Sequence, residues 1–349
     1  MPIYNTSLLK IAREQRGLTQ SALADKLDVK QAVLSKYENG GIVPPEDMQK
    51  KISSILGYPV GFFLQDTEEI PSGLVFHRKR SSLASKTRLQ VEAEVRARSL
   101  DIVKLFHFHS IKSNIIARDG RSAIEMAKTI RRHWNVADGP IENLTELLEK
   151  NNIVVMAFDF GTDKLDGFFM PLTEDVFSIA LNTNAAFSAD RQRHTLAHEL
   201  GHALLEHCKE FPGADCENEA ELFAAELLTP EDCIEAELQP PLTLPRLCAL
   251  KRRWRVSMGS LLYRAHALET IKESIYRRTW ILFSSQGYRK KEPDCGIVGE
   301  TPTLLQQLMG TYIASSENAL DKLCLSPERF KERYPEISLE GQSMTPTVS

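Results

Sequence analysis

Several common sequence signals are missing from this chain. None of the six cysteines forms a C-x-x-C pair, which excludes a dithiol motif of that kind. The start of the chain lacks the long apolar run of a signal peptide, and no apolar stretch approaches the roughly 20 residues that cross a bilayer. Repeats and low-complexity runs are absent as well. We therefore expect a cytoplasmic protein with reduced thiols and no membrane segment.

The chain is long enough for more than one domain. It has 349 residues, the length of two or three domains that each bury a core. Its formal net charge of -4 hides an uneven distribution, because basic residues cluster at 78–98 and 251–255, whereas residues 217–237 are strongly acidic. Charge runs usually form solvated faces, and we expect this for both basic blocks ahead of nucleic-acid contact.

The most informative stretch is Thr195 to His207, which reads T-L-A-H-E-L-G-H-A-L-L-E-H. It contains the H-E-x-x-H pattern at His198, Glu199 and His202. Residues four apart on a helix lie above one another, so both imidazoles project from one face and can hold one cation. Zinc suits neutral imidazole, and a catalytic zinc has three protein ligands and one open position for water. The motif therefore predicts zinc and requires a third ligand.

The best source of that ligand is the segment 216–228. Its apolar residues fall on one helical face, formed by Ala220, Phe223, Ala224 and Leu227. Glu217 lies about 60° from the middle of this face and Glu219 about 100° away on the other side, so Glu217 is the better ligand. Glu221 lies one turn further and can accept the spare ring N–H of a zinc histidine. Glu219 and Glu226 have two equally supported interpretations: each lies either on a solvated face of the helix or at the metal site.

Together these residues resemble the ImmA/IrrE family of bacterial zinc peptidases. H-E-L-G-H followed by E-x-x-A-x-x-F-A-A-E-L-L-x-P is a specific match, and the resemblance extends to residues 138–144, Asp166-Gly167-Phe168, residues 177–182 and Arg193. It implies a peptidase domain whose zinc ligands are His198, His202 and Glu217. The family usually has Asn or Asp where this chain has Glu221, and this weakens the role given to Glu221 beside the histidines.

Helix caps, turn residues and apolar spacing predict a set of short helices over residues 7–65. Thr19 is a suitable cap for a helix over Gln20–Leu27, Asp28-Val29 makes a turn, and a third helix over residues 30–38 stops at Asn39-Gly40-Gly41. Two helices joined by so short a turn indicate a helix-turn-helix, whose second helix enters the major groove of DNA. L-T-Q-x-x-L-A-x-K-L and V-x-x-x-x-L-S-K-Y-E-N-G are similar to the XRE class of phage-repressor-like DNA-binding domains.

The XRE resemblance implies a DNA-contact surface around the third helix. Gln20 and Asn39 would meet the phosphate backbone, whereas Lys30, Gln31, Ala32 and Lys36 would face the bases. The formal charge of this domain is close to neutral, so we expect salt-sensitive binding to operator DNA as a homodimer on a two-fold site. The alternative is a domain that has kept the fold and docks another protein.

We predict an α+β fold that is mainly helical. Its parts are an all-α helix-turn-helix domain at 1–66, a linker at 67–86, a zincin-like peptidase domain with a small sheet at 87–270, and a C-terminal helical region of unknown role at 271–349. The periodicities predict a long helix from Thr87 to about Ile116, helices at 121–134 and 141–150, and strands at 153–158, 167–170 and 176–181. Residues 244–254 and 257–268 form a helix pair with helix-turn-helix spacing, for which packing is the expected role.

The two resemblances imply a DNA-binding zinc endopeptidase that cleaves a partner XRE-type repressor and so controls transcription, in a stress response or on a mobile element. Zinc is the expected metal, with manganese as the alternative. Glu199 would take a proton from the attacking water and return it to the leaving amine. The second hypothesis is a transcription regulator or antitoxin-like DNA binder whose peptidase fold acts as a sensor without turnover. The intact motif favours the enzyme.

Overall fold

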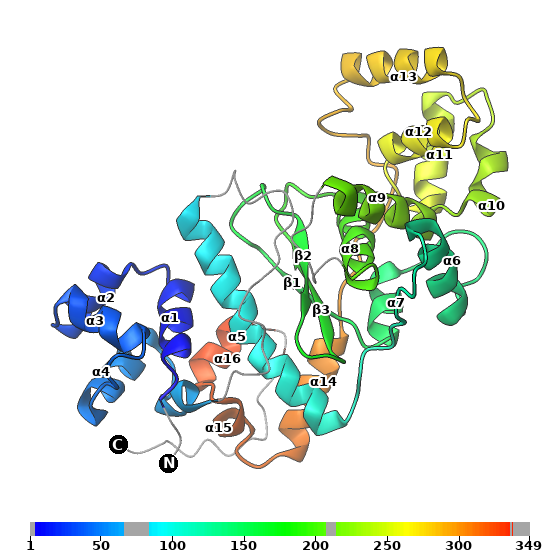
Figure 1. Ribbon diagram of the computed structural model, residues 1–349. Helices are drawn as coiled ribbons and strands as arrows, with labels where there is room; N and C mark the ends of the chain where they lie inside the picture. Colours follow the sequence, from blue (N-terminus) through cyan, green and yellow to red (C-terminus); the bar gives the residue numbers. More distant parts are fainter. Residues whose placement is uncertain (1–3, 66–83, 207–213, 336, 338–349) are drawn as a thin grey trace.

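The computed structural model describes residues 4–65, 84–206, 214–335 and 337 (Figure 1). Helices dominate, and the described strands form one three-stranded sheet, so the predicted mainly helical α+β fold is confirmed. Most of the linker predicted at 67–86 lies outside the described residues. None of the helices in the described part of the chain has the length and apolarity needed to cross a membrane.

The N-terminal domain contains four α-helices and a 3-10 helix. These are α1 (Thr6–Gln15), α2 (Gln20–Leu27), α3 (Gln31–Glu38), α4 (Glu46–Leu56) and η1 (Val60–Leu64). The Thr19 side chain caps α2 as predicted, and Asp28 turns the chain in the left-handed conformation before α3 begins. A buried ion pair between Arg13 of α1 and Glu38 of α3 ties the first helix to the third. The predicted helix-turn-helix is confirmed.

A long helix, α5 (Ser85–His109), separates this domain from the sheet (Figure 1). The predicted end near Ile116 is wrong. Ser110 adopts the left-handed conformation with φ of 52°, and this stops the helix seven residues earlier than its apolar pattern suggested. Helix α1 packs against α5, and α5 contributes to the same core as the N-terminal domain.

The sheet has the strand order β1-β3-β2. Strand β1 (Val154–Phe158) is parallel to β3 (Phe177–Asn182), and β2 (Gly167–Pro171) is antiparallel to β3 at the other side. Pro171 is tolerated because β2 is an edge strand. Glycine is required at position 167, since a Cβ there would lie 2.6 Å from the Ala180 carbonyl oxygen and 2.8 Å from Thr195 Cγ2. Strand β2 therefore lies close against the helix that carries Thr195.

The two faces of the sheet belong to different cores. Val154, Met156 and Phe168 point to the core shared with the N-terminal domain, and Val155 and Phe169 point to the second core. Helices α6 (Ala123–His133), α7 (Leu144–Lys150), α8 (Ala189–Leu204) and α9 (Ala214–Leu228) contribute to this second core. Elements α10 (Glu231–Ile234), η4 (Glu235–Leu238), α11 (Leu244–Trp254), α12 (Met258–Ala267) and α13 (Glu273–Ser285) extend it away from the sheet (Figure 1).

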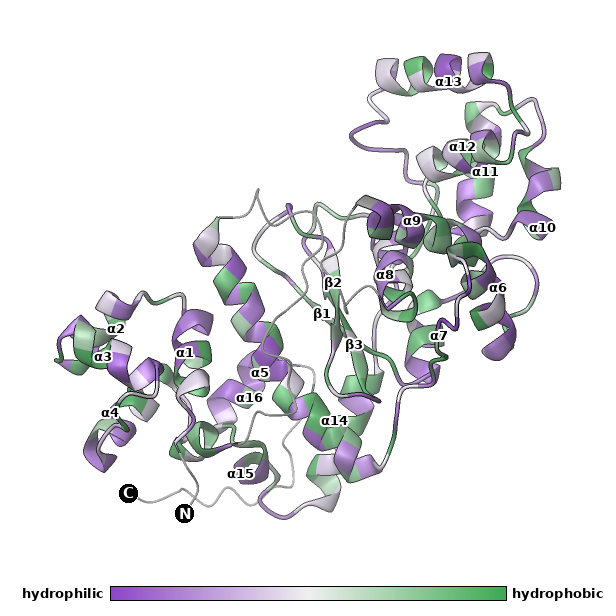
Figure 2. Cartoon of the chain, viewed as in Figure 1, coloured by the Kyte–Doolittle hydropathy of each residue, from purple (hydrophilic) through white to green (hydrophobic). Residues whose placement is uncertain are grey.

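After α13 the chain returns across the molecule to the N-terminal domain (Figure 1). It forms α14 (Leu304–Ser315), α15 (Ala319–Leu323) and α16 (Pro327–Arg333). The largely apolar α14 packs against β1 and α5 (Figure 2). Arg333 of α16 donates to Asp101 of α5 at 2.5 Å and to the Tyr58 hydroxyl at 2.9 Å. The proposed division into domains at residues 66, 86 and 270 stays a prediction, and these last helices join the first core.

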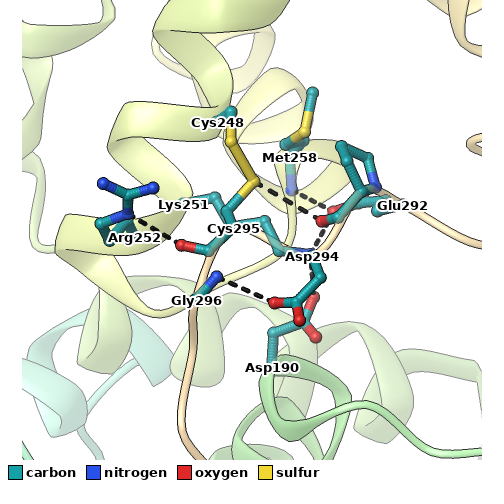
Figure 3. Close-up of a disulfide and its surroundings, with 10 residues drawn as sticks. Asp190, Cys248, Lys251, Arg252, Met258, Glu292, Asp294, Cys295 and Gly296 are labelled. Carbon is teal, nitrogen blue, oxygen red and sulfur yellow. Dashed lines mark hydrogen bonds and ion pairs between the residues drawn. A yellow bond between two sulfur atoms is a disulfide. The ribbon is translucent and has the colours of Figure 1, made fainter.

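Cys248 of α11 and Cys295 form a disulfide (Figure 3). The expectation of reduced thiols is therefore wrong for this pair. The two cysteines are 47 residues apart in sequence, and only the return of the chain past α11 brings them together. Among the described residues Cys216, Cys233 and Cys324 are free thiols. Cysteine spacing carried no signal for this pairing because neither cysteine has a close neighbour of its kind in the sequence.

Candidate metal centre

The candidate centre lies where α8 crosses α9. Gly201 allows the close crossing, because a Cβ at this position would lie 3.0 Å from a ring carbon of Phe223 and 3.3 Å from the Cα of Ala220. The predicted apolar faces of both helices are buried, including Leu200 of α8 and Ala224 of α9. This tight packing places side chains of the two helices within reach of one another.

His198, His202 and Glu217 converge at this crossing. Their nearest ligand atoms all lie within 4.8 Å of one another. The two Nε2 atoms are 3.0 Å apart, and the Glu217 carboxylate oxygens lie 3.7 Å from each of them. His202 is fully buried, and the His198 and Glu217 side chains are more than four-fifths buried. The three predicted ligands are therefore brought together in one largely buried cluster.

The geometry of the cluster fits a small divalent cation. Ligand atoms that surround a tetrahedral zinc at about 2.0–2.2 Å lie about 3.3–3.6 Å from one another. The separations of 3.0 and 3.7 Å in the cluster bracket that range. Two imidazoles and one carboxylate also match the chemistry of catalytic zinc sites, which leave a fourth position for water.

Glu199 lies beside the cluster and outside its three ligands. Its Oε2 accepts a hydrogen bond from the Phe169 backbone N–H of β2 at 2.8 Å. Burial raises the pKa of Glu199 to about 7, although the charge of His198 and the bond from Phe169 act in the opposite direction. A carboxyl group with a pKa near neutrality can both accept and return a proton.

Glu221 bridges two histidines of α8. Its Oε1 lies 3.5 Å from His198 Nδ1, and its Oε2 lies 3.2 Å from His194 Nε2. The first contact has the position predicted for a carboxylate that orients a metal histidine, and this role stays a prediction. Burial lowers the pKa of His198, but hydrogen bonding with Glu217 and the nearby carboxylates outweigh burial, so the pKa is raised.

Sequence reasoning missed His194. It lies four residues before His198 and therefore on the same face of α8, and this spacing was the signal available. Its side chain is 35% exposed, and it lines a cavity of about 690 Å³ between α9 and α12 together with Glu221. His194 is thus a solvent-facing neighbour of the cluster.

Glu219 and Glu226, for which the sequence allowed two interpretations, lie in different environments. Glu219 is half-buried and pairs with Arg118 at 2.6 Å, away from the three ligands. Glu226 is fully buried and pairs with Arg264, so a solvated face is wrong for this residue. Its helix position faces α12, which the sequence could not show. Neither acid belongs to the metal cluster.

A buried ion pair supports the helix that carries the two histidines. Arg193 of α8 pairs with Glu300, a residue of the segment between α13 and α14, and both side chains are more than nine-tenths buried. Arg193 also donates to the Ile141 carbonyl at 2.8 Å, and Glu300 accepts the Thr145 N–H at 2.8 Å. The segment around Glu300 therefore links α8 to the start of α7.

The raised pKa of Glu199 predicts a pH-dependent stability of the metal-free protein. The unfolded chain ionises this carboxyl group near its ordinary pKa of 4.5, whereas the folded chain ionises it at about 7. Below pH 4.5 the carboxyl group is protonated in both states, and its contribution to the unfolding free energy is fully present. This contribution is lost as pH rises through 7, because ionising the buried group costs free energy in the folded chain. We expect the loss in unfolding free energy between pH 5 and pH 8 to be about 3 kcal/mol smaller in chelated Glu199→Gln than in chelated wild type, as measured by urea titration. Equal losses of unfolding free energy in the two proteins would contradict a raised pKa of Glu199.

The predicted DNA-contact residues lie together on the N-terminal domain. Lys30, Gln31, Ala32, Lys36 and Asn39 are exposed on or beside α3. Gln20 is half-buried, donates to Glu38 at 2.8 Å and accepts from Gln31 at 2.7 Å. Because α1 packs against α5, the exposed side of α3 remains open (Figure 1). Their individual roles toward phosphate or bases stay predictions.

The fold and the cluster define a helix-turn-helix domain of the DNA-binding type joined to a domain of the metallopeptidase type. Comparison with protein families identifies both parts: residues 9–63 match the helix-turn-helix model, and residues 148–266 match the peptidase model described as the IrrE N-terminal-like domain. The chain is therefore an XRE-type helix-turn-helix domain fused to an ImmA/IrrE-type domain. A comparison with curated proteins gave no match.

Proposed function

We propose that this protein is a zinc-dependent endopeptidase that cleaves an XRE-type repressor and thereby controls transcription. The observation that carries this proposal is the convergence of His198, His202 and Glu217 beside a separate buried carboxyl group, Glu199. A zinc ion held by these three side chains would lower the pKa of water to about 7 and polarise a peptide carbonyl. Manganese is the alternative metal.

The protein's own residues account for proton transfer. Glu199, a buried carboxyl group beside the cluster that is not one of its three ligands, would accept a proton from the attacking water and later deliver it to the leaving amine. The Phe169 N–H holds one oxygen of this carboxyl group in place. Glu221 orients His198 through its Nδ1 atom. No residue is assigned to the stabilisation of the oxyanion.

The outer edge of β2 supplies a docking site for the substrate backbone. The Leu172 N–H donates to the Val176 carbonyl, and the Asn182 N–H donates to the Asp166 carbonyl. These bonds show that the backbone N–H and C=O groups of the even-numbered residues of β2 point toward β3. The backbone groups of Gly167 and Phe169 therefore face outward. Because the Phe169 N–H is bonded to Glu199 and Pro171 has no N–H, an added strand would pair with the Gly167 N–H and with the carbonyl groups of Gly167 and Phe169. An extended peptide added at this edge would pass beside the metal cluster with limited sequence preference.

The helix-turn-helix domain places the enzyme near its substrate. An XRE-type repressor binds operator DNA, and a peptidase with a DNA-binding domain of the same class can meet it there or through matching helical domains. The second candidate is a transcription regulator whose peptidase fold acts as a sensor, and the open face of α3 is the observation that favours it.

Metal removal tests the proposal. Purified protein is incubated with a panel of XRE-type repressors, itself included, after chelation and after addition of zinc or manganese. We expect cleavage with metal and none after chelation, with about one ion bound per chain in the wild type and strongly reduced binding in His202→Ala. The products are read by mass spectrometry. Tight operator binding without cleavage of any panel member under any metal condition would instead support the regulator.

A further inference from the structure

A large excess of positive charge lies far from the helix-turn-helix domain. Twelve of the residues from 244 to 291 are Arg or Lys, and two are Asp or Glu. We call this region, which forms α11, α12, α13 and the following loop, the basic lobe. Residues 4–65 hold eight basic and six acidic side chains, so the helix-turn-helix domain is close to neutral. The chain as a whole has a formal net charge of -4.

Some cations of the basic lobe are structural, and others remain available. Lys251 pairs with Asp190 and Glu292, and Arg264 pairs with Glu226, all in buried or half-buried positions. Six exposed cations of the lobe have no carboxylate partner within the described chain. Arg252 donates to the Cys295 carbonyl and Arg289 lies over the Trp280 ring, and the other four have neither contact: Lys272, Arg278, Lys290 and Lys291. Exposed cations without a carboxylate partner are suited to a polyanion, because no protein ion pair has to be broken first.

Other protein groups cover the start of α12, the part of a second helix that enters the groove in a helix-turn-helix. The turn of the helix pair α11–α12 repeats that of the N-terminal domain, since Arg255 adopts the left-handed conformation as Asp28 does. However, the Glu292 carboxylate accepts the Met258 N–H at 2.8 Å (Figure 3). It also accepts the Gly259 N–H at 2.8 Å and so occupies the N-terminus of α12. Trp280 of α13 lies against Gly259 as well. These contacts agree with packing at the start of α12, and the role of the helix pair stays a prediction.

Helix α13 is the outermost element of the basic lobe, at the opposite end of the molecule from α3 (Figure 1). Phe283 is buried on its inner side, whereas Arg277 and Arg278 are exposed on its outer side. Hydrophilic and hydrophobic residues alternate along this helix (Figure 2). The guanidinium of Arg289 lies 4.8 Å from the Trp280 ring, which holds the start of the cationic loop against α13.

We propose that the basic lobe is a second DNA-binding surface, which binds the phosphate backbone of duplex DNA without sequence preference. Affinity for DNA depends on the number of phosphates that cations neutralise, and the near-neutral helix-turn-helix domain supplies few. The basic lobe supplies the missing cations. Because it lies at the other end of the molecule, it contacts DNA outside the base pairs that α3 reads (Figure 1).

The test measures binding of the full chain to a fluorescent 40-base-pair duplex of arbitrary sequence at several salt concentrations. The lobe variant combines Lys272→Gln, Arg278→Gln, Lys290→Gln and Lys291→Gln. We expect the slope of log K against log salt to fall by about 0.9 for each lost phosphate contact, and the affinity at about 0.1 M salt to fall at least tenfold. Unchanged far-ultraviolet circular dichroism would show that the exposed substitutions leave the fold intact.

A matched control removes the same charge elsewhere. It combines Arg132→Gln, Lys150→Gln, Lys322→Gln and Lys331→Gln, which are exposed residues outside both DNA-binding regions. We expect its slope and affinity to equal those of the wild type. Equal losses in the two variants would reduce the effect to net charge and overturn the proposal. An unchanged slope in the lobe variant would overturn it too, as would loss of binding to phosphatidylserine vesicles with DNA binding intact, which would assign the lobe to a membrane surface.

Discussion

Glu199→Gln is expected to reduce the rate of repressor cleavage by about 10² to 10⁴-fold, the usual contribution of a general base. The amide keeps the size of the carboxyl group but cannot accept the proton of the attacking water. Glu199 is not among the three clustered ligands, so the variant should bind as much zinc as the wild type. Steady-state kinetics on a cleaved repressor, together with metal analysis of the same sample, measure both quantities.

The control for this prediction is Glu219→Gln, which makes the same chemical change in a carboxylate that pairs with Arg118 away from the cluster. It should keep both the cleavage rate and the metal content. His202→Ala should lose both, because it removes a ligand. Cleavage by Glu199→Gln at the wild-type rate would refute the proposed role of this carboxyl group, even with the metal site intact.

Glu300→Ala is expected to lower the free energy of unfolding by about 3–5 kcal/mol. The substitution leaves the Arg193 guanidinium without its carboxylate partner in a site where both side chains are more than nine-tenths buried. It also removes the acceptor of the Thr145 N–H at the start of α7. Urea-induced unfolding of the metal-free protein measures the change. Since Arg193 precedes His198 by five residues on α8, weaker zinc binding should accompany it.

Two further variants separate the lost pair from a general effect of charge removal. Glu146→Ala breaks an exposed pair with Lys150 and should cost no more than about 1 kcal/mol. Arg193→Met combined with Glu300→Leu removes both charges and should recover much of the stability lost in Glu300→Ala. If Glu300→Ala costs as little as Glu146→Ala, the segment between α13 and α14 does not support α8.

The sequence predicted best those features that depend on neighbours along the chain. Helix α2 begins after Thr19 and ends at Leu27 as expected, because a side-chain cap and a left-handed turn residue are local properties. The two histidines share a face because they are four apart on one helix. Glu217 was identified by a helical-wheel argument that needed only the assumption that a second helix crosses the first. The crossing itself rests on Gly201 and Phe223.

Features that join distant segments were missed or misjudged. The apolar pattern of α5 continued past its true end, since Ser110 stops the helix by a backbone conformation that the pattern does not encode. Glutamate is usually a surface residue, but Glu226 is buried because α12 brings Arg264 to it. His194 was passed over because its link to the site is a contact with Glu221, a residue of another helix.

By itself, the sequence determined the helix-turn-helix, the two candidate metal-binding histidines and the candidate carboxylates, because caps, turns and helical periodicity act over a few residues. The tertiary structure alone decided that residues 292–334 return to both cores. It brought together residues that are far apart in the sequence. These are Arg193 and Glu300, 107 residues apart, Cys248 and Cys295, 47 residues apart, and Arg333 and Asp101, 232 residues apart. Such contacts depend on where packing places whole elements, and burial then gives these pairs their energetic weight.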